Sequence, residues 1–175
     1  MRTFKQYLES LKACAAAIKW AGDKPIEQVV ADCHRGDWLL WLAKKCGVEL
    51  QPLTLAKGHC ANTVRHLMSD ERSVKAVDVA IAFGEGRATR DELDAATAAA
   101  YAATAAAYAA ARTAAYASAA AYVAAAYAAH ASAAAYAADA AAVYANRMQT
   151  ADICRKLIGD LIIEKVNQQL KQTDL

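Results

Sequence analysis

The sequence predicts an all-α protein, and three observations carry this prediction. Only two prolines and seven glycines interrupt the 175 residues, and strand-like alternation of apolar and polar residues is almost absent. Apolar residues instead recur at the period of an amphipathic helix. A long Ala/Tyr-rich stretch then continues without glycine or proline until Gly159. We expect one domain, residues 1–175, folded as a multi-helix bundle or a short helical array.

The first part of the chain, residues 1–94, is expected to form short helices with mixed surface charge. Apolar residues from Phe4 to Ile18 indicate one amphipathic helix, which the sequence AGDKP ends. Pro25 suits the first position of a second helix, and Asp37 is a good N-cap for a third.

Three further helices are predicted before the alanine-rich segment. Pro52 can open a helix that continues through LTLAKGHCANTVRHLM, and Ser69 or Asp70 can cap the next. Thr89 and Glu92 have the spacing of a capping box, in which each side chain bonds the backbone N–H of the other residue. Another helix should therefore begin directly after Thr89.

Residues 95–145 are rich in alanine and tyrosine and are expected to be helical, because alanine is the best helix former. About fifty helical residues would span about 75 Å, which is too long for a compact domain of this size. We therefore expect at least one break, near residues 113–118 or near Ser132, where hydroxyl groups compete for backbone hydrogen bonds. A C-terminal amphipathic helix is expected in residues 146–175, with an apolar face that begins at Met148.

Seven of the eight tyrosines lie in this alanine-rich segment. In a continuous helix they would share one half of the circumference, on the side that also bears Arg112 and His130. Two roles are open for them. They pack as core against the N-terminal helices, or they line a ligand site together with Arg112 and His130.

Composition argues against several classes of partner. The net charge of +2 gives no strong basic field, so neither DNA nor RNA is expected as a partner. Residues 113–138 of the alanine-rich segment carry no Lys, Arg, Asp or Glu, but they lack the leucine and isoleucine that drive membrane insertion, so no membrane span is expected. Five cysteines, an odd number without a CxxC pair, indicate reduced thiols in a cytoplasmic protein.

The chain carries no strong catalytic signature. It has no P-loop, no GxSxG, no HExxH and no dinucleotide fingerprint, so we expect neither an enzyme nor a cofactor. The pairs Cys33-His34 and His59-Cys60 contain zinc-ligand residue types, but they lack the usual ligand spacing. No metal site is therefore expected.

Arginine and aromatic residues recur at predicted helix starts and along the tyrosine stripe. Arginine pairs bidentately with phosphate, aromatic rings stack on flat rings, and the free N–H groups of a helix N-terminus favour anions. These properties suit a ligand with phosphates and a flat ring. The candidate ligand-binding residues are Arg35, Trp38, Arg87, Arg90, Tyr101, Tyr108, Arg112 and His130.

The order of several stretches resembles a known family. ACAAAIKWAGDKPIEQVVADCHRGDWLLWLA is followed by GEGRATRDELDAA, an Ala/Tyr tract and ADICRKLI. Together they resemble the immunity proteins of the immunity-family-five type, which occur in bacterial polymorphic-toxin loci and in phages. The resemblance extends from Leu11 to Ile158 and is weakest over 48–72. It implies an all-helical, non-catalytic protein that neutralises its target by binding.

We therefore expect a cytoplasmic immunity or anti-defence protein that acts by stoichiometric sequestration. The expected partner is a small anionic nucleotide-like ligand. A toxin or defence protein is the alternative partner. A third possibility is a structural protein that forms a homo-oligomer through close-packed alanine faces.

Overall fold

The computed structural model describes residues 2–68, 70–102 and 129–172, with the backbone alone for residues 129–141. All regular structure in these ranges is helical and none of it is strand, which confirms the all-α prediction. Among the same residues, no helix combines the length and the apolar character needed to cross a membrane.

The N-terminal region contains the short helices α1 (Phe4–Ser10), α2 (Ala15–Ala21) and α3 (Ile26–Asp32). The prediction of one helix from Phe4 to Ile18 is wrong, because Lys12 adopts a left-handed backbone conformation with φ 58°. The N–H groups of Lys12 and Ala13 donate to the carbonyls of Glu9 and Leu8, both at 3.0 Å. This hydrogen-bond pattern is a Schellman motif, which ends α1 and lets α2 pack against it.

The middle of the chain forms α4 (Gly36–Lys45), α5 (Leu50–Asn62), the 3-10 helix η1 (Arg65–Leu67) and α6 (Glu71–Gly84). Helix α5 begins at Leu50, so Pro52 does not open it as predicted, and it ends earlier than predicted. Asp70 caps α6 by accepting a hydrogen bond from the backbone N–H of Arg72, as predicted. The capping box is also confirmed, since Thr89 N donates to Glu92 Oε2 at 2.7 Å and Glu92 N donates to Thr89 Oγ1 at 3.2 Å.

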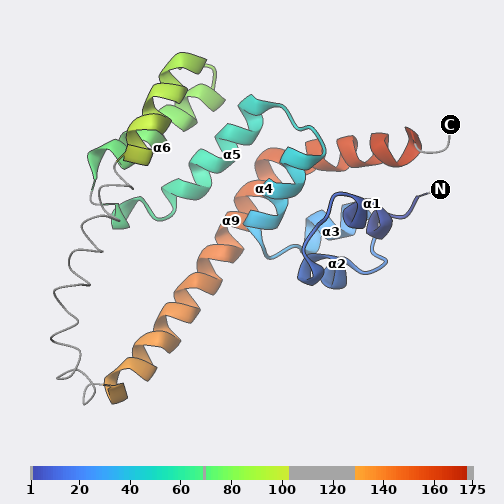
Figure 1. Ribbon diagram of the computed structural model, residues 1–175, viewed down its shortest axis with the longest axis horizontal. Coiled ribbons are helices and arrows are strands. Elements are labelled where there is room, and N and C mark those ends of the chain that lie inside the picture. Colours follow the sequence, from blue (N-terminus) through green and yellow to red (C-terminus); the bar gives the residue numbers. More distant parts are fainter. Residues whose placement is uncertain (1, 69, 103–128, 173–175) are drawn as a thin grey trace.

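Helix α9 (Ala129–Gln172) is a single helix of 44 residues that crosses the molecule (Figure 1). At 1.5 Å per residue it spans roughly 66 Å. The predicted break near Ser132 is wrong, because this residue lies within α9. The alternative break at residues 113–118 lies outside the described residues.

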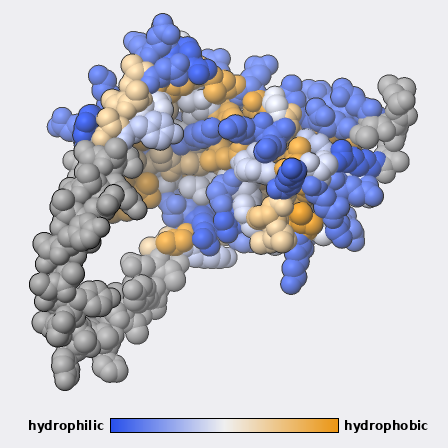
Figure 2. All heavy atoms as spheres, in the orientation of Figure 1, coloured by the Kyte–Doolittle hydropathy of each residue, from blue (hydrophilic) through white to orange (hydrophobic). Residues whose placement is uncertain are grey.

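One face of α9 forms the centre of the core. Its residues Ala151, Cys154, Ile158, Ile162 and Val166 are each at most 1% exposed. Helices α3, α4 and α5 all pack against α9. Figure 2 shows hydrophilic residues over most of one face, with hydrophobic residues gathered in its middle. Met148, which the sequence pattern also assigns to the apolar face, is exposed.

Helices α5 and α6 form a close-packed pair at the edge of the molecule (Figure 1). A Cβ atom on Gly84 would lie 2.6 Å from Leu55 Cα, and one on Gly58 would lie 2.8 Å from Ile81 Cγ1. Each helix therefore contributes a glycine where the other brings a large side chain. Glycine at position 58 weakens the α5 helix locally, and this close contact with α6 is the reason for a glycine there.

Candidate anion-binding groove

The start of α4, the end of α5 with η1, and α9 surround an open groove of about 1090 Å³. Its polar side chains come from all three walls. They are Arg35, Asp37, Thr63, His66, Asn146, Arg147, Gln149 and Thr150.

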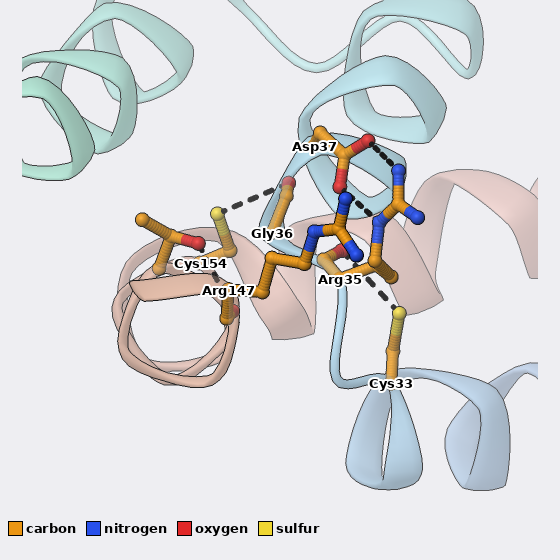
Figure 3. A network of polar contacts seen from close by, with 7 residues as sticks. Cys33, Arg35, Gly36, Asp37, Arg147 and Cys154 are labelled. Carbon is orange, nitrogen blue, oxygen red and sulfur yellow. Dashed lines mark hydrogen bonds and ion pairs between the residues drawn. The ribbon is translucent and has the colours of Figure 1, made fainter. Parts of the chain in front are cut away.

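The turn that precedes α4 positions Arg35. Asp37 does not serve as the predicted N-cap, because α4 begins at Gly36, two residues before the predicted start at Trp38, with Arg35 at the cap position. Asp37 instead accepts two hydrogen bonds from Arg35, at 2.7 Å from Nε and 2.6 Å from Nη2 (Figure 3). This bidentate pair fixes the plane of the guanidinium group. The Cζ atom of Arg35 also lies 4.8 Å from the ring centroid of Trp38, within cation–π range.

Hydrogen bonds from sulfur and nitrogen hold the same turn in place, and Figure 3 shows those from the two sulfurs. Cys33 Sγ donates to the carbonyl of Arg35 at 3.4 Å, and Cys154 Sγ donates to the carbonyl of Gly36 at 3.6 Å. From α9, Arg155 Nη1 donates to the carbonyl of Cys33 at 2.5 Å. Burial raises the pKa of the Cys33 thiol, so this group stays a neutral donor at neutral pH. The turn is therefore tied to the core helix.

A second arginine faces the same carboxylate. Arg147 of α9 extends its guanidinium group toward Asp37 (Figure 3). The hydrogen bonds from Arg35 are the main reason why the pKa of Asp37 is low, and the charge of Arg147 lowers it further. Two permanent cations therefore share one anion at the groove, which leaves a local excess of positive charge.

Helix α9 and the end of α5 supply further polar groups. Asn146 Nδ2 on α9 donates to Thr63 Oγ1 at 2.7 Å, and Thr63 Oγ1 donates to the carbonyl of Cys60 at 2.7 Å. These bonds link α9 to the end of α5 across the groove. His66 and Cys60 also line this part of the groove.

Trp38 lines a separate apolar cavity of about 380 Å³ and touches the groove lining through Arg35. The cavity is lined by Trp20, Trp38 and Trp41 together with residues of α1. The rings of Trp20 and Trp38 are 5.9 Å apart between centroids, and Lys24 Nζ lies 4.2 Å from the Trp20 centroid. The tryptophans thus line a cavity and are only partly buried.

The structure brings only part of the predicted ligand set together. Arg35 lines the groove and is in contact with Trp38. Arg87 lies elsewhere, since it pairs with Glu85 and lines a shallow depression beside α6. Arg90 pairs with Asp94 one turn further along its own helix, at 2.9 Å.

The remaining predicted residues belong to the tyrosine stripe. Tyr101 is 73% exposed and Tyr144 is 57% exposed, so neither packs as core. Tyr108 and Arg112 lie outside the described residues. His130 is in the first turn of α9, where only the backbone is described.

Sequence reasoning missed Arg147, Asn146 and Thr63. A signal was present for Arg147, which is the first charged residue after Asp139 at the end of the alanine-rich segment. Its position opposite Asp37 depends on how α9 packs against α4, which no local pattern encodes.

Comparison of the chain with protein-family models, with curated proteins and with solved structures finds no match. The resemblance to the immunity-family-five type therefore stays a prediction. Among the described residues, no group of three or more His, Cys, Asp or Glu side chains is placed to hold a metal ion.

Proposed function

We propose that this protein is a non-enzymatic binding protein of immunity or anti-defence type. It sequesters a small anionic, nucleotide-like ligand, one ligand for each site, in the groove between α4, α5 and α9. The observation that carries the proposal is the pair of arginines, Arg35 and Arg147, that face the single carboxylate of Asp37.

The charge balance supports an anionic ligand. Because Asp37 holds Arg35 through Nε and Nη2, the guanidinium group is oriented before any ligand arrives. Arg147 is exposed, so it is free to turn toward an incoming phosphate. A phosphate would gain charge-assisted hydrogen bonds from both groups.

The size and composition of the groove support a nucleotide-like ligand. Its volume of about 1090 Å³ lies slightly above the usual range for small-molecule sites, about 300–1,000 Å³, so it has room for a nucleotide. Asn146 and Thr63 offer hydrogen bonds of the kind that bases and riboses make. The resemblance to immunity proteins adds the biological setting, in which binding alone neutralises the target.

Calorimetric titration with a panel of cyclic dinucleotides and ADP-ribose-type nucleotides tests the proposal. We expect saturable binding of at least one member. Charge-assisted hydrogen bonds are worth about 1.5–3 kcal/mol, so Arg147→Ala should weaken that binding by roughly tenfold or more.

Arg90→Ala is the matched control. This arginine is also exposed and also lies near an aspartate, Asp94, but it is outside the groove lining. Its substitution should leave the affinity unchanged. Equal losses in the two variants would show that the effect is one of net charge and not of the groove.

A partner toxin protein is the second candidate, and one observation favours it. Leu67, which is 72% exposed, and Val143, which is 49% exposed, stand at the rim of the same groove. Exposed apolar side chains are typical of protein interfaces. No heat with any nucleotide, together with tight binding to a co-encoded toxin, would replace the small-ligand proposal with this one.

A further inference from the structure

Two thiols from helices far apart in the sequence meet beneath the groove. The Sγ atoms of Cys60 on α5 and Cys154 on α9 are 3.7 Å apart, although 94 positions separate the residues. Cys154 is fully buried, whereas Cys60 is only partly buried and lines the groove. Cys60 is therefore the residue of the pair that borders the open groove, and the buried Cys154 lies in contact with it.

We propose that Cys60 and Cys154 form a reversible redox-modification site, in which a peroxide oxidises the pair to a disulfide that clamps α5 to α9. The sulfurs need to approach by about 1.7 Å to reach the roughly 2.05 Å of a disulfide bond. This proposal stands independently of any ligand in the groove.

The oxidation proceeds in two balanced steps. The Cys60 thiolate attacks one oxygen of hydrogen peroxide, the O–O bond breaks, and Cys60 becomes a sulfenic acid as hydroxide leaves. Cys154 sulfur then attacks the Cys60 sulfur. The S–OH bond breaks, and the departing hydroxide takes the Cys154 proton to form water. Two thiols and one peroxide thus give one disulfide and two waters.

The surroundings of the pair favour this order of events. The hydrogen bond with Cys154 lowers the pKa of Cys60, while the same contact and burial raise the pKa of Cys154. Cys60 is therefore the thiol that ionises first and also the one that peroxide can reach. Cys154 has a second role, as a donor to the Gly36 carbonyl, and disulfide formation would release that carbonyl.

The other cysteines provide internal controls. Cys33 and Cys46 are buried, and each donates to a nearby carbonyl within its own turn. Cys14 is exposed and lies beside the apolar cavity, outside the groove lining. It has the access that oxidation requires but lacks the placement of Cys60 beside Cys154.

The test uses the full chain, treated with hydrogen peroxide and then digested without reductant. We expect a Cys60–Cys154 cross-linked peptide in the mass spectrum, a loss of two free thiols from the five, and full reversal by dithiothreitol. Because the cross-link closes a long loop, the oxidised protein should unfold at a higher temperature, by roughly 5–15 °C.

Two variants decide the assignment. Cys60→Ser should abolish the cross-link and the shift in unfolding temperature, and Cys14→Ser should leave both unchanged. Sulfinic or sulfonic acid at Cys60 without a cross-link would overturn the proposal. So would a cross-link between any other pair of cysteines.

Discussion

Gly36 lies directly against the backbone of Thr150 where α4 crosses α9. A Cβ atom at Gly36 would lie 2.6 Å from Thr150 Oγ1 and 2.7 Å from the Thr150 carbonyl carbon. The absence of a side chain at this position sets how closely the two helices approach. It also sets the distance from which Arg147, less than one turn earlier on α9, faces Asp37.

The Gly36→Ala variant should separate α4 from α9, because backbone atoms of Thr150 cannot move aside as a flexible side chain can. Overpacking of this kind costs about 1–3 kcal/mol of unfolding free energy. Denaturant unfolding followed by circular dichroism measures the loss.

Gly159→Ala is the control for this substitution on α9. A Cβ atom there would lie 3.3 Å from Val30 Cγ1, a side-chain atom that can shift slightly. Alanine also favours the helix by about 0.5–1 kcal/mol relative to glycine, so this variant should be near neutral. A large loss in Gly159→Ala and none in Gly36→Ala would contradict the packing described for both positions.

Two adjacent isoleucines on α9 test the position of the core. Ile162 is fully buried, whereas Ile163 is only partly buried at its edge. Ile162→Ala should destabilise the protein by about 2–5 kcal/mol, because it leaves a cavity among α9 and its neighbours. Ile163→Ala should cost clearly less in the same denaturation experiment. Equal losses would mean that α9 is rotated relative to the arrangement described.

The cap of α6 should persist far into the acid range. The side-chain hydrogen bond from Arg72 is the main cause that lowers the pKa of Asp70 to about 2, from an ordinary value of 3.8. Because the folded pKa is lowered, the carboxylate stabilises the fold above pH 3.8, and this contribution disappears as the pH falls through about 2.

Carbon-detected NMR titration of the Asp70 carboxyl group measures this pKa. In Arg72→Ala the midpoint should move up toward the ordinary value, although the backbone N–H of residue 72 still donates. An unchanged midpoint would exclude the Arg72 side chain as the cause.

Alkylation of Cys60 should begin at a lower pH than for an ordinary thiol. Its pKa lies below the ordinary value of 9.0 because its sulfur is in hydrogen-bond contact with the Cys154 sulfur. The rate of reaction with iodoacetamide should therefore fall only when the pH drops below that lowered pKa. In Cys154→Ala this contact is gone and the midpoint should rise. A midpoint that does not change would assign the reactivity to exposure alone.

Local signals in the sequence predicted two of the caps correctly. The Thr89–Glu92 capping box and the Asp70 cap depend on atoms within three residues of each other, so the pattern holds the needed information. The helical class also follows from local properties, namely the scarcity of glycine and proline and the high helix propensity of alanine.

Helix ends and breaks that depend on tertiary packing could not be predicted from local sequence. Lys12 adopts a conformation that glycine prefers, so nothing in its identity indicates that α1 ends there. Ser132 offered a hydroxyl group that competes for backbone bonds, but α9 continues through it. Asp37 was a reasonable cap by composition, yet the two hydrogen bonds from Arg35 hold its carboxylate elsewhere.

Of the residues at the candidate site, only those from the N-terminal part of the chain were predicted. Arg35 and Trp38 are near each other in the sequence and were identified together. Arg147 joins them only because Gly36 allows α9 to approach closely. The contact between Cys60 and Cys154 likewise depends on tertiary packing. It forms because α5 and α4 both pack against α9.

The central place of α9 has a consequence for folding during synthesis. The buried faces of α3, α4 and α5 pack on residues between Ala151 and Val166, which the ribosome makes last among these elements. Until that segment emerges, α3, α4 and α5 lack the central surface that buries much of their apolar area, although α5 can already pack against α6. The nascent chain must therefore hold an incomplete core through most of its synthesis, and the core closes in one late step.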